Sequence, residues 1–204
     1  VLGNPVRTQI DVSKPVDQAR LAYGLDPNRA TVLAFGGSLG AHTINTSIER
    51  ALPEIADRPW QLLWQTGKGY TPPSVLPPNV TMLPFLEDMG SAYAAADLVV
   101  SRSGATTIAE LGIVGKPAIL VPLATASTNE QQHNARVLEK HHAAIVISDN
   151  VLREILLPTI DSVMTDPNSR STMSNAMLSL GKPFAAHDAA RLVLRIGDRE
   201  RGSS

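Results

Sequence analysis

The segment 97–110 reads Asp-Leu-Val-Val-Ser-Arg-Ser-Gly-Ala-Thr-Thr-Ile-Ala-Glu and carries residue types that suit the binding of a phosphorylated ligand. A short apolar run stops at small polar residues, and helical spacing begins at Ala105. The first N–H groups of such a helix have no intrahelical partner, and Gly104 and Ala105 are too small to keep an anion away from them. The segment therefore predicts a phosphate site at the start of a helix.

Thr107 and Glu110 are three residues apart and share one face of the same helix. The carboxylate of Glu110 could accept a hydrogen bond from a sugar hydroxyl. Alternatively, the two residues form a capping box, which only satisfies the end of the helix. The sequence alone leaves both interpretations open.

A second turn, Gly36-Gly37-Ser38-Leu39-Gly40-Ala41, also leads into a helix. Two helix starts at one edge of a sheet favour a diphosphate, since each stabilises an anion by about 0.3–1 kcal/mol when exposed and up to about 2 kcal/mol when partly buried. Ser38 is expected to cap the helix, to contact phosphate, or both.

Two other phosphate-binding patterns fit this chain poorly. The dinucleotide pattern needs three glycines where the chain has Gly36, Ser38 and Ala41, and no acidic residue follows the next strand to hold a ribose. No stretch has the spacing of a P-loop. NAD binding and ATP hydrolysis are therefore disfavoured.

The elements that must position these turns alternate between strands and helices, which predicts an α/β fold with a doubly wound, Rossmann-like parallel sheet of about six strands. Strands are expected at 31–35, 60–65, 80–85, 98–100, 117–121 and 143–147, and helices at 17–23, 41–55, 89–96, from 105, 131–140, 152–164, 169–180 and 187–196. Residues 1–16 are expected to form an interdomain linker, and residues 17–204 the ligand-binding domain.

Composition excludes several classes of function. The chain has 204 residues, 43% of them hydrophobic, which is enough to bury a core. Its net charge of −1 offers no basic field for nucleic acid, and it has no cysteine. The absence of cysteine and of an obvious signal peptide suggests the cytoplasm.

No carboxylate pair or histidine cluster predicts a metal site, because Glu87 and Asp88 are better explained as the acidic start of a helix.

Several spaced motifs together resemble the C-terminal, donor-binding half of the MurG family of peptidoglycan N-acetylglucosaminyltransferases, which have the GT-B fold and are of the family 28 type. The motifs are Gly3-Asn4-Pro5-Val6-Arg7, 35–41 with Asn45, Gln65-Thr66-Gly67, 85–89 with Tyr93, Asp97, 102–105 with Thr107 and Glu110, and Gln131 with Asn134-Ala135. They occur in order as far as Ala135, and residues after Ser148 match only in general pattern.

The resemblance implies transfer of N-acetylglucosamine from UDP-GlcNAc to the C4 hydroxyl of undecaprenyl-pyrophosphoryl-MurNAc-pentapeptide, with inversion, at the cytoplasmic face of the inner membrane. UDP-GlcNAc is then a substrate, and no cofactor is expected. The implied donor contacts are Leu86 and Met89 for uracil, Glu110 for ribose, Arg7, Ser38, Gly104, Ala105 and Thr107 for the diphosphate, and Gln131 and Gln132 for the sugar. Leu39 and Glu130 differ from the glutamine and histidine common in the family.

Some of these residues have simpler explanations. Arg7 could be an exposed cation of the linker, and Gln131 and Gln132 could form an ordinary polar helix start. Arg102 is expected to pair with a carboxylate and hold its loop in place rather than contact phosphate.

No catalytic base can be assigned in this chain. Its histidines are scattered through the predicted helices and are expected to be surface or packed residues: His42, His133, His141, His142 and His187. The resemblance places the base and the acceptor pocket in an N-terminal acceptor domain that is absent from this chain, so the chain alone is expected to bind UDP-GlcNAc weakly without turnover.

Two other functions stay open. One is a non-catalytic UDP-sugar-binding subunit of a two-chain glycosyltransferase. The other is a UDP-sugar 2-epimerase-like domain, which would need acidic and histidine groups around C2 of the sugar, and no such constellation is apparent.

Overall fold

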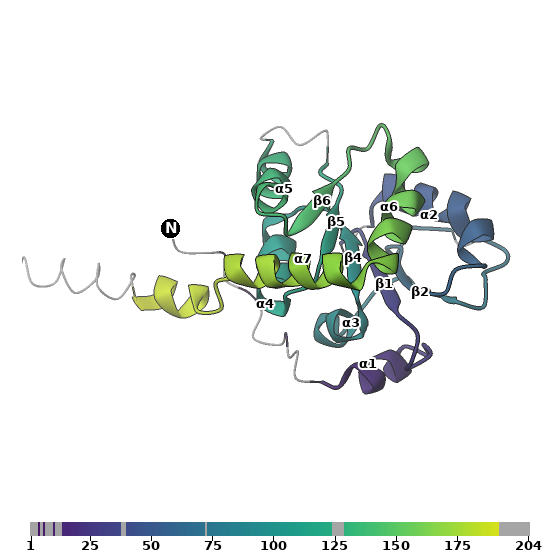
Figure 1. Cartoon of the computed structure of the whole chain (residues 1–204), viewed down its shortest axis with the longest axis horizontal. Coiled ribbons are helices and arrows are strands. Elements are labelled where there is room, and N and C mark those ends of the chain that lie inside the picture. The colour runs from purple at the N-terminus through teal and green to yellow at the C-terminus, as the bar shows by residue number, and fades with distance from the viewer. Residues whose placement is uncertain are drawn as a thin grey trace, which may run out of the picture.

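The computed structural model describes residues 4, 6, 10, 14–37, 40–71, 73–123 and 129–191, and Arg7 and Ser38 lie outside them. Within these ranges, six parallel strands form one sheet in the order β3-β2-β1-β4-β5-β6 (Figure 1). The strands are β1 Thr31–Phe35, β2 Gln61–Gln65, β3 Val80–Leu83, β4 Leu98–Ser101, β5 Ala118–Leu120 and β6 Ala144–Val146. The predicted doubly wound parallel sheet is confirmed.

Seven helices connect and cover the strands of the described residues. They are α1 Val16–Ala22, α2 His42–Ile55, α3 Met89–Ala95, α4 Ala105–Val114, α5 Glu130–Lys140, α6 Leu152–Thr165 and α7 Pro167–Leu180. Residues 185–191 are also helical, so the helix predicted at 187–196 begins earlier, and its part beyond 191 lies outside the described residues.

Some predicted boundaries were wrong for local reasons. The strand predicted at 80–85 ends at Leu83, because Pro84 has no N–H group to donate to a neighbouring strand. The helix predicted from Ser169 begins at Pro167, since the Asp166 carboxylate accepts hydrogen bonds from the amides of Asn168 and Ser169 and so caps it earlier.

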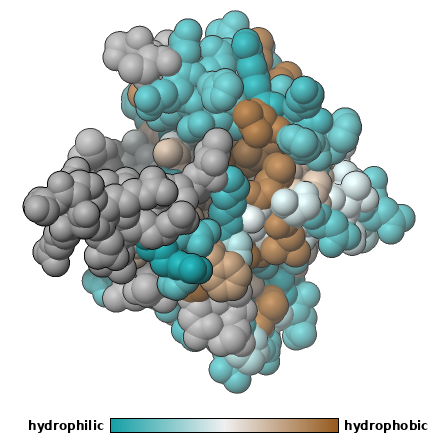
Figure 2. All heavy atoms as spheres, turned by 90° about the vertical axis from the view of Figure 1, so that its left-hand side faces the viewer, coloured by the Kyte–Doolittle hydropathy of each residue, from teal (hydrophilic) through white to brown (hydrophobic). Residues whose placement is uncertain are grey.

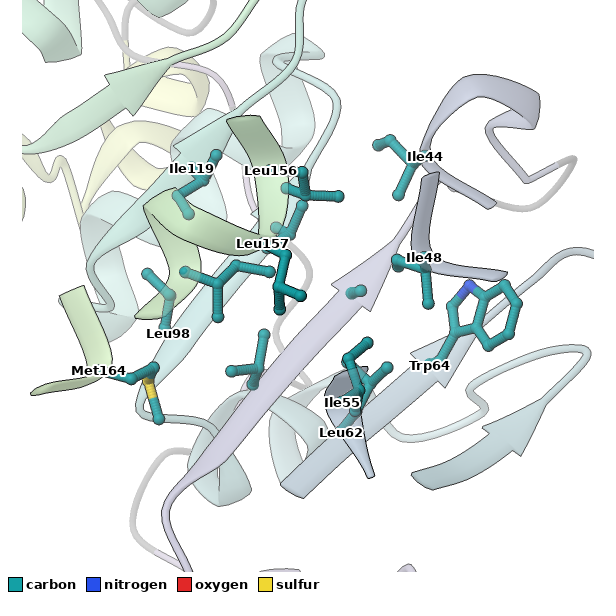
Figure 3. Packing of buried hydrophobic residues seen from close by; sticks show 14 of the residues in the cluster. Ile44, Ile48, Ile55, Leu62, Trp64, Leu98, Ile119, Leu156, Leu157 and Met164 are labelled. Carbon is teal, nitrogen blue, oxygen red and sulfur yellow. The ribbon is translucent and has the colours of Figure 1, made fainter. Parts of the chain in front are cut away.

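The side chains of the strands alternate between two hydrophobic layers. Val32 and Ala34 of β1 pack on the side covered by α2 and α6, whereas Leu33 and Phe35 pack on the side of α1 and α3. Figure 3 shows the first layer, in which isoleucines of α2 and leucines of α6 lie over the strands. Because both faces are buried, the strands read as continuous apolar runs in the sequence.

The strand order reverses between β1 and β4. From this pair the chain builds outward to β2 and β3 on one side and to β5 and β6 on the other. Phe35 and Ser101 are register partners at the carboxyl ends of the two strands. In open parallel sheets, ligands bind at this point of reversal.

The opposite edge of the same strand pair is fixed by Asp97. One carboxylate oxygen, Oδ2, accepts hydrogen bonds from Nη2 of Arg20 and from the amide of Thr31, both at 2.7 Å. Asp97 therefore holds α1 and the start of β1 against β4. This contact lies at the amino ends of the strands, opposite their carboxyl ends. Within the described residues, no helix is both long and apolar enough to cross a membrane.

Candidate functional site

A cavity of about 290 Å³ lies at the carboxyl ends of β1 and β2, next to the start of α4. Four of the sequence-predicted donor residues line it, namely Leu86, Met89, Thr107 and Glu110. The other lining residues are Phe35, Gly37, Gln65, Phe85 and Thr106, to which the sequence assigned no contact with a ligand. The cavity occupies the position where this class of sheet binds ligands.

Glu110 lines the cavity although only 4% of its surface is exposed. Its Oε2 atom accepts a hydrogen bond of 2.9 Å from the hydroxyl of Tyr93, which is completely buried. The capping-box interpretation of Thr107 and Glu110 is wrong, because Gly104 is the N-cap and the two residues are the third and sixth of α4. The carboxylate is instead placed in the wall of the cavity.

The start of α4 is open. Gly104 is its N-cap, no side chain is seen to cap it within the described part of the chain, and the first intrahelical hydrogen bond runs from the amide of Ile108 to the carbonyl of Gly104. The helix therefore does not use the amides of Ala105, Thr106 and Thr107. Ala105 is exposed, and a Cβ atom on Gly104 would meet no atom within 4 Å. An anion could approach these amides directly.

The glycine-rich turn after β1 forms a second wall. The amide of Gly40 donates to the carbonyl of Gly37 at 3.0 Å, and the N-cap of α2 is Ala41, whose side chain has no group that could cap the helix. Nε2 of the buried Gln65 donates to the carbonyls of Gly37 (3.0 Å) and Pro84 (3.2 Å). Gln65 thereby ties this turn to the segment that carries Phe85 and Leu86. The sequence placed Gln65 in a motif, but only the fold shows that it joins these two segments.

Arg102 has the structural role that the sequence predicted. Its Nη1 atom contacts Oδ1 of Asp149 at 2.9 Å and donates to the carbonyl of Val121 at 3.1 Å, while Nη2 donates to Oγ1 of Thr43 at 2.7 Å. The guanidinium therefore joins the turn before α4 to the start of α2 and to the segment after β6.

Gln131 and Gln132 do not line the cavity. Oγ of Ser103 donates to the carbonyl of Gln131 at 2.7 Å, which places the start of α5 beside the turn before α4. The side-chain oxygen of Gln131 accepts from the amide of Leu123 at 3.0 Å, and Gln132 is exposed. Their contacts with a sugar remain a prediction, as do those of Arg7 and Ser38.

Asp88 fixes the start of α3 next to Leu86. Its carboxylate accepts from the hydroxyl and the amide of Ser91, which lowers the pKa of Asp88, and it also contacts Nζ of Lys14 at 3.4 Å. The hydroxyl of Tyr23 donates to the carbonyl of Asp88, and burial together with the Asp88 charge raises the pKa of Tyr23 to about 12. The acidic pair Glu87 and Asp88 was expected to begin this helix, and Asp88 does so.

All five histidines are exposed, and none lines the cavity. Among the residues that the structure describes, no group of three or more histidine, cysteine, aspartate or glutamate residues could hold a metal ion.

The opposite face of α4 is apolar. A groove of about 410 Å³ lies between α4, α5 and α7 and is lined by Ile108, Val137 and Leu180, among others. Figure 2 shows hydrophobic surface gathered on this side of the molecule. The polar residues Thr107 and Glu110 line the cavity instead, so the two faces of one helix have different chemistry.

Comparison with known proteins agrees with this arrangement. The glycosyltransferase family 28 C-terminal domain matches residues 31–192. The UDP-N-acetylglucosamine–N-acetylmuramyl-(pentapeptide) pyrophosphoryl-undecaprenol N-acetylglucosamine transferases of Listeria monocytogenes serovar 1/2a and Cytophaga hutchinsonii are 40% and 39% identical over 202 residues. These alignments cover 95% and 98% of this chain, and 55% of each relative. The chain thus spans about half the length of the curated relatives it matches.

Solved structures show the same fold. The crystal structure of MurG from Acinetobacter baumannii superposes with a TM-score of 0.74 at 27% identity, covering 93% of this chain and 55% of that one. The glycosyltransferase of kitacinnamycin shares the fold at a TM-score of 0.65 and 22% identity, over 82% of this chain and 43% of that chain. The six-stranded sheet is therefore that of the C-terminal domain of a GT-B glycosyltransferase. By its match over residues 31–192, this chain belongs to the glycosyltransferase family 28 C-terminal domain family.

Proposed function

We propose that this domain binds UDP-GlcNAc in the cavity at the ends of β1 and β2. The observation that carries the proposal is that residues of two separate motifs, Leu86 with Met89 and Thr107 with Glu110, line one cavity at the reversal of the strand order. Relatives of 35–40% identity are named for transfer of N-acetylglucosamine, which supports this donor.

Each part of the donor has a matching group. Uracil would lie against Leu86 and Met89, with the backbone of Leu86 available to its polar edge. The ribose hydroxyls would donate to the Glu110 carboxylate. The diphosphate would lie at the open start of α4, where the amides of residues 105–107 face no helical acceptor. Gln131 and Gln132 would contact the sugar hydroxyls. Arg7 and Ser38 would contact the diphosphate.

In the proposed reaction, the C4 hydroxyl of undecaprenyl-pyrophosphoryl-MurNAc-pentapeptide attacks C1 of the sugar and UDP leaves with inversion. Negative charge grows on the β-phosphate as the bond to C1 breaks. Fixed amides at the start of α4 stabilise that charge without having to reorient, and loss of one such donor typically lowers the rate by about 10²–10³-fold. The domain supplies the leaving-group side of the reaction in this way.

We also propose how this domain works within a longer enzyme. Residues 1–16 would form the linker and residues 17–204 the donor domain. An N-terminal acceptor domain would supply the base and the pocket for the lipid-linked acceptor. The lipid in the names of the relatives suggests a peripheral enzyme at the cytoplasmic face of the inner membrane.

Calorimetric titration tests the donor assignment. The chain should bind UDP-GlcNAc, bind UDP-GalNAc more weakly and not bind NADH. Glu110→Ala should weaken UDP-GlcNAc binding by at least about tenfold, because a hydrogen bond to a charged group is lost.

The variant Glu110→Gln keeps the shape of the side chain and serves as a check on folding, which circular dichroism follows in parallel. Binding of NADH, or an unchanged affinity for UDP-GlcNAc in both Glu110 variants, would argue against the proposal.

A further inference from the structure

Tyr93 connects two walls of the cavity without lining it. It belongs to α3, which begins at the base-side residue Met89, and it donates to Oε2 of Glu110 in α4 at 2.9 Å. The ring of Phe35, at the end of β1, meets the Tyr93 ring edge-on with centroids 6.0 Å apart and planes at 76°. The tyrosine of α3 is therefore held by contacts from two other elements, α4 and β1.

Tyr93 and Glu110 are both almost fully buried, so their geometry has little freedom. A buried carboxylate is costly unless hydrogen bonds compensate for its lost hydration, and a hydroxyl that donates to it forms a strong, charge-assisted bond. With Oε2 engaged by Tyr93, the plane of the carboxyl group is fixed relative to the cavity. A fixed acceptor selects between ligands better than one that can rotate toward whatever is present.

We propose that Tyr93 is a positioning residue that aims the Glu110 carboxylate at the ribose hydroxyls, and so gives the site its selectivity for a ribonucleotide. This inference rests on the proposed function, since it takes Glu110 as the ribose acceptor. It predicts that the hydroxyl of Tyr93 matters for ligands that carry ribose hydroxyls and is irrelevant for ligands that lack them.

The test compares UDP with 2′,3′-dideoxy-UDP on the 204-residue chain. In the wild type, UDP should bind at least about tenfold more tightly than the dideoxy analogue, as expected for hydrogen bonds to a charged group. Tyr93→Phe keeps the ring and its contact with Phe35 but removes the hydroxyl. In this variant the ratio of the two affinities should fall close to one, because UDP binds more weakly while the affinity for dideoxy-UDP is unchanged.

Tyr70→Phe is the matched control. The hydroxyl of Tyr70 also donates to a glutamate, Glu49, and its ring also packs edge-on against an aromatic ring, that of Trp64. This pair does not line the cavity, so Tyr70→Phe should keep the wild-type ratio. In the Glu110→Gln background, Tyr93→Phe should change the ratio no further, because the two residues act through one contact.

The outcomes separate the two proposals. A wild type that does not bind UDP overturns the proposed function and this inference with it. A wild type that binds UDP and dideoxy-UDP equally overturns the ribose role of Glu110 but leaves UDP binding standing. If Tyr93→Phe keeps the ratio, or weakens both ligands by the same factor as a purely structural change would, the positioning role is refuted while the donor site stands.

Discussion

The two glycine-bearing turns at the ligand edge of the sheet, 36–40 and 102–104, use glycine for different reasons. A Cβ atom on Gly36 would overlap the backbone of Gly40 and Ala41, and one on Gly40 would overlap the carbonyl of Thr66. Gly40 also has a φ of +77°, which favours glycine. Gly104 has φ −63° and ψ 150°, and its Cβ position is empty.

Packing requires glycine in the first turn but not in the second. Packing explains Gly36 and Gly40, because no larger residue fits the first turn. Packing does not explain Gly104, whose backbone angles suit any residue. What distinguishes Gly104 is its place at the start of α4, beside the cavity, where a small residue would let the proposed diphosphate approach the helix amides.

Gly36→Ala should have the largest effect on stability. The added methyl group meets backbone atoms, which cannot move aside as a flexible side chain would. The turn must shift, and we expect a loss of about 3 kcal/mol in the free energy of unfolding, at the upper end for overpacked sites. Urea unfolding measures this value. An unfolding free energy within about 0.5 kcal/mol of wild type would show that the first turn is not fixed by packing.

Arg102→Met should have the next largest effect on stability, because Arg102 links the second turn to the helix that follows the first. It removes the contacts with Asp149 and Thr43 that hold the turns together, at a cost of about 2 kcal/mol in unfolding free energy for a hydrogen-bonded charge that is mostly buried. Because the start of α4 is no longer held in place, UDP binding should weaken too. Unfolding in urea and calorimetric titration give the two values.

Arg58→Met is the matched control for that prediction. Arg58 pairs with Asp161 at 2.8 Å and joins the end of α2 to α6, and neither residue lines the cavity. Its loss should lower stability without changing UDP affinity. Equal effects of the two variants on UDP binding would contradict a special role for Arg102.

How much of this was predictable depends on how far apart the interacting residues are in the sequence. The alternation of apolar runs with helical spacing predicted the sheet and both turns, because each depends on neighbouring residues. Glu110 was predicted to lie near the ligand from its position within one helix. The choice between ligand contact and capping box could not be made, since it depends on whether α4 begins at Ala105 or three residues later, at Ile108.

The roles of Gln65 and Tyr93 could not be read from the sequence. Gln65 contacts Gly37, 28 residues away, and Tyr93 contacts Glu110, 17 residues away. Both pairings exist only because β2 lies beside β1 and α3 packs against β1. Likewise, the pairing of Arg102 with a carboxylate was predicted, but its partner, Asp149, was set by the packing of a distant segment.

Gly104→Ala should affect UDP binding rather than stability, the opposite of Gly36→Ala. The methyl group enters empty space, so stability should stay within about 0.5 kcal/mol of wild type or rise slightly through the less flexible unfolded chain. UDP affinity should fall by about tenfold, because the methyl group lies beside the amides proposed to hold the diphosphate. Thermal unfolding and titration with UDP test the two parts.

Gly69→Ala provides the reference for that variant. Gly69 also has an empty Cβ position, but it does not line the cavity. Neither its stability nor its UDP affinity should change appreciably. If Gly104→Ala behaved in the same way, the second turn would have no detectable link to the ligand.

Asp88→Ala should have the smallest effect and extends the comparison to α3, a helix of the site that a side chain does cap. Loss of an N-cap typically costs about 1 kcal/mol. Hydrogen bonds from Ser91 lower the pKa of Asp88 in the folded state, so its contribution is fully present above the unfolded pKa and is lost as the pH falls through the folded pKa. The difference in unfolding free energy between wild type and Asp88→Ala should therefore shrink in acid. Asp88→Asn keeps a side-chain oxygen that can accept from the amide of Ser91, so its difference from wild type should be smaller near neutral pH. That difference should shrink in acid by the same amount, because neither variant has the titrating carboxylate. A difference that stays constant with pH for Asp88→Ala would mean that packing, and not the charged cap, holds the start of α3, and the contrast with the open start of α4 would lose its electrostatic basis.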